Sequence, residues 1–142
     1  METADVRRRV LLRIAEVRQA AAARRADVDA AERAFPPFLT EVAAPVGRMF
    51  AQALTAEGYP FMMSTPSRAL RLTPERSRND FIEIELDTAL NSPQVIGRVN
   101  YTHGSRGVAI ERPIRENTAV ADLTQDDVLD FLVAELGPFV EK

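Results

Sequence analysis

The sequence predicts an α+β fold in which an N-terminal helical hairpin with a long first helix precedes an antiparallel sheet of about four strands and a C-terminal helix. Apolar residues recur at every third or fourth position before Gly58 and again after Thr124, which is the period of an amphipathic helix. Between these regions apolar and polar residues alternate, which is the period of a strand. Because no helical pattern separates the predicted strands, the sheet is expected to be antiparallel.

The 142 residues suit one domain, made of a helical hairpin (1–57), the sheet (58–115) and the C-terminal helix (116–142). The chain contains no cysteine, which excludes disulfides, thiol catalysis and thiolate metal sites. All basic residues except the final Lys142 are arginine, which argues against lysine-dependent phosphate loops and Schiff-base chemistry. No secretion signal or membrane-spanning stretch is recognisable, so we expect a cytoplasmic protein.

Residues 3–34 are expected to form the first helix, since Thr3 is a suitable N-cap and neither glycine nor proline occurs before Pro36. Apolar side chains form one stripe along this helix with steps of three and four, interrupted where Arg24 takes a seam position. We define the association stripe as Val10, Ile14, Val17, Ala21 and Val28. A stripe of this length predicts either a coiled coil with another copy of the chain or a helix packed along its own fold, and the sequence leaves both open.

The segment Phe35-Pro36-Pro37-Phe38 is predicted to end the first helix, because a residue that precedes proline is disfavoured in the α region. A second helix is then expected from Pro37 to Glu57, kinked or delayed by Pro45 and capped by Gly58. Its apolar face consists of Leu39, Val42, Val46, Phe50, Ala53 and Leu54. The two helices would form a hairpin.

The clearest strand spans residues 80–87, where three apolar residues alternate with the acidic residues Glu83, Glu85 and Asp87. The other predicted strands are 94–102, 107–114 and the weaker 68–73, and residues 59–64 are a further candidate. A final helix begins after Thr124, a suitable N-cap, and ends at Gly137. Its expected buried face consists of Val128, Leu129, Phe131, Leu132 and Leu136.

His103 is the only histidine, so the chain cannot build a histidine-rich metal site. His103 can complete a Ser-His-Asp triad only if a carboxylate from elsewhere in the fold lies against it. A carboxylate enzyme that uses Glu83 and Glu85 with His103 is one alternative function. However, Arg71 and Arg98 on neighbouring strands are expected to pair with these acids. We therefore assign no catalytic residue, no metal and no cofactor.

Four arginines lie around one predicted strand and its loop and define another alternative, the binding of phosphate groups or nucleic acid. These residues are Arg68, Arg71, Arg76 and Arg78. The acidic pI of about 5.3 argues against this alternative, because nucleic-acid modules are typically basic. A membrane-surface role is also disfavoured, since arginines and acids are mixed around the first helix.

Charge is distributed unevenly along the chain. Residues 1–25 carry seven arginines and three acids, a net charge of +4, whereas residues 116–142 carry seven acids and one lysine, a net charge of −6. Regions of opposite sign can pair within one chain or between two. The leading hypothesis is a non-enzymatic protein that binds a protein partner, or a second copy as a homodimer, through the association stripe.

Overall fold

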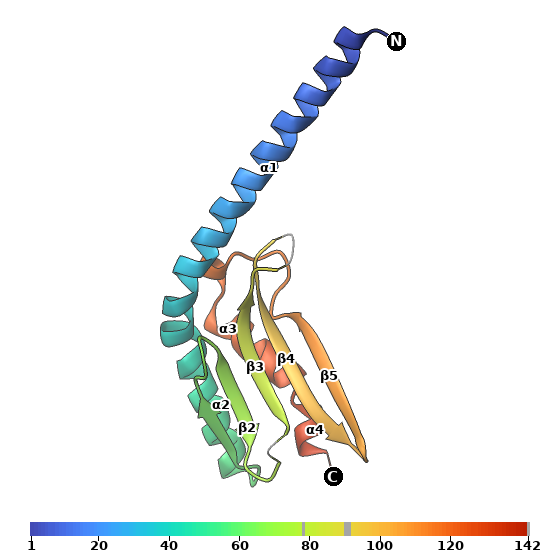
Figure 1. Ribbon diagram of the computed structural model, residues 1–142. Helices are drawn as coiled ribbons and strands as arrows, with labels where there is room; N and C mark the ends of the chain where they lie inside the picture. Colours follow the sequence, from blue (N-terminus) through green and yellow to red (C-terminus); the bar gives the residue numbers. More distant parts are fainter. Residues whose placement is uncertain (78, 90–91, 142) are drawn as a thin grey trace.

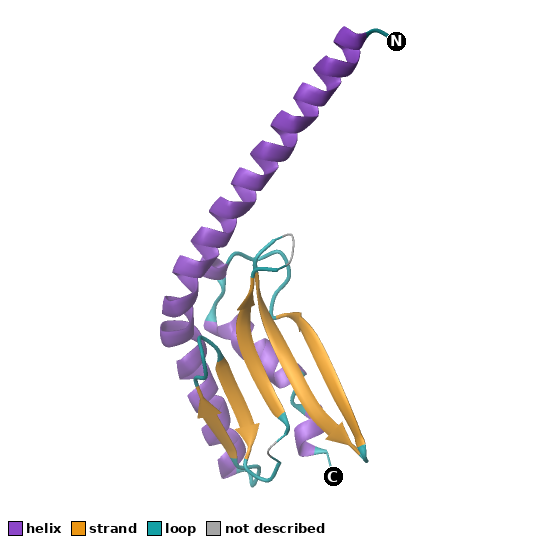
Figure 2. Cartoon of the chain, viewed as in Figure 1, coloured by secondary structure: helices purple, strands orange, loops and turns teal. Residues whose placement is uncertain are grey.

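In the computed structural model, which describes residues 1–77, 79–89 and 92–141, helices cover one face of a five-stranded antiparallel sheet (Figure 1). The predicted α+β class is therefore confirmed. One long helix extends far beyond these two layers, and Figure 2 shows that the extension is helical almost to the N-terminus. The C-terminus lies at the opposite end of the molecule (Figure 1).

The helices lie at the two ends of the sequence and the strands between them. The helices are α1 (Thr3–Pro37), α2 (Ala44–Ala56), α3 (Gln125–Ala134) and α4 (Gly137–Val140), with a π-helical segment η1 (Phe38–Ala43) and a 3-10 turn η2 (Val120–Asp122). The strands are β1 (Phe61–Ser64), β2 (Leu70–Pro74), β3 (Phe81–Asp87), β4 (Gln94–His103) and β5 (Arg106–Pro113). The sheet has one strand more than the predicted four, because the further candidate at 59–64 forms β1.

The predicted helical hairpin is wrong, because α1, η1 and α2 follow one another as a single bent helix (Figure 1). Pro37 adopts helical backbone angles, φ −61° and ψ −38°, so proline costs the helix a hydrogen-bond donor here without turning the chain. The backbone widens after the two prolines, where the N–H of Ala44 donates to the carbonyl of Leu39, five residues back. Phe35 and Phe38 on either side of the prolines are both buried and stack at 5.9 Å, which holds the helix on the body.

The helix ends where the sequence predicts it. Gly58 adopts a positive φ of 92°, which glycine tolerates without steric cost. The N–H of Tyr59 donates to the carbonyl of Leu54 at 2.8 Å and the N–H of Gly58 to that of Thr55 at 3.1 Å, a Schellman motif.

The strands form a simple meander, in which each one pairs antiparallel with the next in the sequence. The helices pack on one face of this sheet, and the core consists of side chains from that face, from α2 and α3, and from the lower end of α1. Phe131 of α3 lies directly on the backbone of Gly97 in β4, where a side chain would overlap the ring. Arg112 of β5 covers the same ring at 4.7 Å and its Nε donates to Glu135 at 2.7 Å. These contacts place α3 across the sheet.

We expect Gly97→Ala to destabilise the fold by about 1–3 kcal/mol, because the added methyl group would displace the Phe131 ring from a packed core. Urea unfolding followed by circular dichroism measures this change. Gly107→Ala on β5 is the matched control, since nothing lies within 4 Å of the position its methyl group would occupy. Equal stability of the two variants would show that Phe131 does not depend on Gly97.

The N-terminus of α3 generates a pH-dependent prediction. The N–H of Thr124 donates to Oδ2 of Asp127 at 2.9 Å, and the N–H of Asp127 donates to Oγ1 of Thr124 at 3.2 Å, which is a capping box. Burial by itself would raise the pKa of Asp127, but the hydrogen bonds from Thr124 and the charge of Arg115 lower it overall. Ionised Asp127 therefore stabilises the fold above the carboxyl's usual pKa, and this contribution is lost as the pH falls through the lower folded value.

We expect Asp127→Asn to lower the free energy of unfolding by about 1 kcal/mol at pH 7, which is typical of a lost charged cap. The difference from the native chain should shrink in acid, where the native carboxyl is protonated as well. Thermal unfolding of both chains between pH 7 and pH 2 measures this, and a difference that stays constant would contradict the assignment.

Candidate functional site

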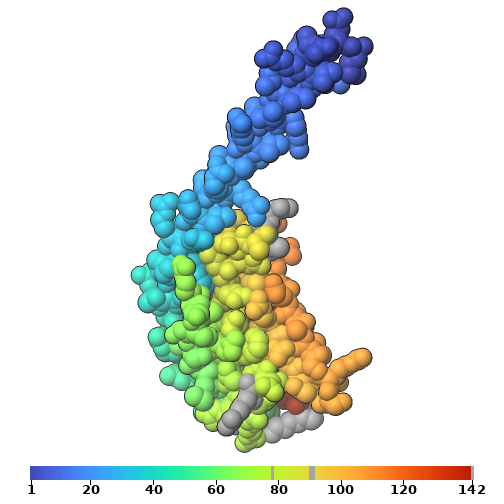
Figure 3. Space-filling view, in the orientation of Figure 1, coloured from blue at the N-terminus to red at the C-terminus, as the bar shows by residue number. Residues whose placement is uncertain are grey.

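The N-terminal arm, which we define as residues 3–27 of α1, projects from the body as a narrow rod (Figure 3). All of its residues are exposed. Val10, Ile14 and Val17 of the association stripe are 51%, 40% and 50% exposed. The sequence left open whether the stripe packs against the chain's own fold or against another copy. These three residues of the stripe do not pack against their own fold.

The other end of the stripe reaches the body of the protein. Ala21 and Val28 line a shallow hollow together with Thr88 from the loop after β3, and Val28 is half-buried. Ala31, one turn further, belongs to the core. The stripe therefore begins in solvent and continues into the interior along one helix face.

Two exposed ion pairs lie along the arm. Asp5 pairs with Arg8 at 3.4 Å and Glu16 with Arg13 at 3.3 Å, and all four side chains are more than half exposed. Such pairs contribute only a few tenths of a kcal/mol each. Since most of the stability of a helix in a protein comes from packing of its apolar face, contact with a partner would stabilise the arm.

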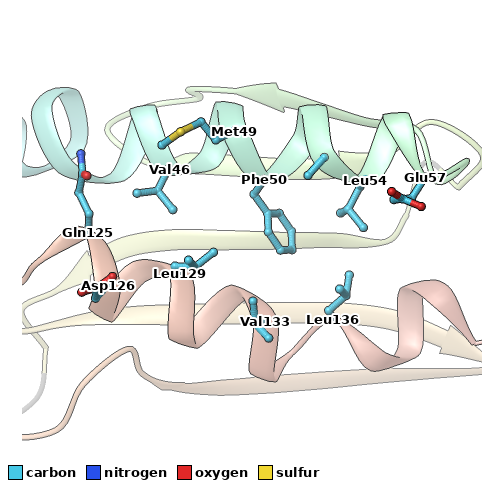
Figure 4. A pocket seen from close by; sticks show the side chains of 11 residues that line it. Val46, Met49, Phe50, Leu54, Glu57, Gln125, Asp126, Leu129, Val133 and Leu136 are labelled. Atoms are coloured by element: carbon cyan, nitrogen blue, oxygen red, sulfur yellow. The ribbon is translucent and has the colours of Figure 1, made fainter.

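A second uncovered apolar surface, which we call the helix groove, lies between α2 and α3 with a volume of about 440 Å³ (Figure 4). Phe50 and Leu54 point into it from α2, and Leu129 and Val133 point into it from α3 (Figure 4). Met49, Leu129 and Val133 are 57%, 41% and 57% exposed. The gap between the two helices is therefore open to solvent along an apolar floor.

The groove was not predicted, and Leu129 was wrongly placed on the buried face of the last helix. Val128, Phe131 and Leu132 direct α3 onto the sheet, which leaves Leu129 on its flank. Leu129 and Val133 are four residues apart and so form a second apolar stripe, a signal that the sequence does contain. Only the position of α2 beside this stripe turns it into a groove.

The face of the sheet that the helices leave uncovered carries alternating charges. In the strand register Arg71 lies opposite Glu83, and Glu83 lies opposite Arg98. Nε of Arg71 donates to Oε2 of Glu83 at 2.6 Å, and its Nη2 lies 2.6 Å from the same oxygen. Nη2 of Arg98 lies 2.5 Å from Oε1 of Glu85, and its Nε lies 3.5 Å from Glu111. The expected cross-strand pairing is confirmed.

Glu85 has a raised pKa, mainly because of burial, while Arg98 opposes the rise and the neighbouring acids Glu83, Glu111 and Asp87 add to it. A carboxyl with a raised pKa is common in catalytic sites. Here the raised pKa of Glu85 comes mainly from burial, and Arg98 already pairs with its Oε1 within a structural charge network.

The proposed enzyme site is not assembled in this fold. His103 is exposed at the end of β4, in the turn that connects it to β5. Glu83 lies opposite Arg98 of β4. His103 is five residues after Arg98 on β4, which places it about 17 Å along the strand from the position of Glu83. Glu83 and Glu85 are paired with arginines instead.

The arginines of the phosphate-binding alternative are also kept apart. Arg71 is held by Glu83 and lies over the Phe81 ring at 4.4 Å. Arg68 and Arg76 are exposed in the loops before and after β2, so the length of the strand separates them. Arg78 lies outside the described residues.

Within the described residues, no group of three or more acidic or histidine side chains is placed to hold a metal ion. No helix in that part of the chain combines the length and apolarity needed to cross a membrane. Comparisons of the chain with protein-family models, with curated proteins and with solved structures give no match.

We expect Glu83→Gln to lower the free energy of unfolding by about 1–3 kcal/mol, because Glu83 is only 5% exposed and lies between Arg71 and Arg98. The cost stays below that of a fully buried pair, since both arginines are about 40% exposed and can rehydrate. Glu111→Gln is the control: Glu111 is half exposed, so a change within about 0.5 kcal/mol is expected. Urea unfolding measures the loss in the free energy of unfolding for both variants. Equal losses would show that Glu83 is not the centre of the network.

Proposed function

We propose that this protein is non-enzymatic and acts by associating with protein, with a second copy of itself as the first partner, through the N-terminal arm. The observation that carries the proposal is the exposure of Val10, Ile14 and Val17 along one face of a projecting helix. An isolated apolar residue on a surface needs no explanation, but a periodic stripe on a helix without neighbours favours a contact surface.

Burial of the stripe would favour association. Fully burying an exposed valine or isoleucine side chain contributes about 1.5–3 kcal/mol. Val10, Ile14 and Val17 are about half exposed, so three such residues from each of two copies would offset part of the free-energy cost of bringing two chains together, which is roughly 4–15 kcal/mol. Ala21 would let another helix approach closely at its level.

The two alternative functions have no comparable support. Arg71 is engaged by Glu83, and the exposed arginines of β2's flanking loops lie at opposite ends of the strand. His103 lies away from the carboxylates with which it would act. We therefore carry the association hypothesis forward.

Ile14→Glu should weaken association at least tenfold, because it places a charge in the middle of the stripe. Leu12→Glu is the matched control: Leu12 is 58% exposed but lies two residues away, on nearly the opposite side of the helix. Light scattering after size exclusion, at two protein concentrations and two salt concentrations, measures the mass of each chain. A wild type that stays monomeric at the highest concentration, or equal effects of the two variants, would contradict self-association through the stripe.

A further inference from the structure

The helix groove has an apolar floor and an acidic rim. Glu57 lines it at the end of α2, and Asp126 lines it at the start of α3. Asp130 follows Asp126 by one turn and is exposed. No basic side chain is among the residues that line the groove in the described part of the chain. Its chemistry therefore fits an apolar ridge with basic flanks.

The arm has this complementary chemistry. Its apolar ridge consists of Val6, Val10, Ile14 and Val17, which are 45%, 51%, 40% and 50% exposed. At 100° per residue, Arg7 and Arg18 flank the ridge on one side, and Arg9 and Arg13 flank it on the other. An amphipathic helix that lays its apolar face into an apolar groove is a common mode of recognition.

The two surfaces also have the same length. The ridge from Val6 to Val17 spans eleven residue steps, and the groove from Val46 to Glu57 spans eleven residue steps along α2 and its C-cap. With a rise of 1.5 Å per residue, each is about 16 Å long. A docked arm would thus cover the groove over its whole length along α2.

The arm cannot reach the groove of its own chain, because α1, η1 and α2 are one continuous helix and the arm points away from the body (Figure 1). We infer that the arm of one copy docks in the helix groove of a second copy, with its arginines facing Glu57, Asp126 and Asp130. This inference rests on the proposed function and names the surface that receives the arm. Each copy carries one arm and one groove, so the contact can be made in both directions within a dimer or repeated along an open chain.

The test uses the full chain with one substitution in the groove. Met49→Glu places a charge on the groove, and because Met49 is 57% exposed the fold should tolerate it. Met62→Glu is the matched control, since Met62 is 60% exposed and lies on β1, away from the groove. We expect Met49→Glu to weaken association at least tenfold in light scattering and Met62→Glu to leave it unchanged, with unchanged circular dichroism for both.

Mixing two variants tests the pairing directly. The Ile14→Glu chain keeps an intact groove and the Met49→Glu chain keeps an intact arm, so the mixture should form a complex at concentrations at which each variant alone is monomeric. The complex should weaken as salt is raised, because the ridge flanks and the groove rim carry opposite charges.

The outcomes separate this inference from the proposed function. If Ile14→Glu dissociates the protein while Met49→Glu leaves it associated, the arms pair with each other as a coiled coil: the inference is overturned and the proposed function stands. If both variants are monomeric alone and their mixture forms no complex, the inference is likewise overturned, while the loss of association in Ile14→Glu still supports the proposed function. If neither variant changes the mass, or the wild type is monomeric throughout, both are overturned.

Discussion

The continuity of the helix from Thr3 to Ala56 determines where the association stripe lies relative to the body of the protein. Phe35 and Phe38 are buried just below the arm, so the helix is fixed to the body at this point and the arm leaves it in a set direction. A chain that turned back at Pro36 would have covered the stripe with its own second helix. Because the helix continues instead, Val10, Ile14 and Val17 of the stripe stay in solvent.

The second constraint is the close approach of α3 to the sheet. Gly97 has no side chain, and Phe131 fills the space that a side chain would take. This allows α3 to pack close to the sheet, beside α2, and directs Val128 and Leu132 into the core. Leu129 and Val133 remain on the flank that faces α2. The groove is thus a consequence of how two helices pack on one sheet.

The opposite face of the sheet shows why a sequence rich in acids and arginines need not form a binding site. Glu83, Glu85 and Arg98 neutralise one another across neighbouring strands, and Arg71 both pairs with Glu83 and covers the Phe81 ring. Charges satisfied in this way are of little use to a ligand, because binding would first have to break their pairs. The helix groove lies instead on the helical side of the molecule.

The sequence by itself determined the alternation that defines the strands, the capping of α3 by Thr124, the helix end at Gly58 and the stripe along α1. These features depend on hydrogen-bond geometry and on side-chain spacing within a few residues, which a sequence displays directly. The tertiary structure decided that the helix continues through Pro36 and Pro37, that α3 rests on Gly97 and that a groove opens beside Leu129. Those outcomes depend on the burial of side chains between segments that are distant in the chain. This burial outweighed the tendency of proline to end a helix, and no local sequence pattern records it.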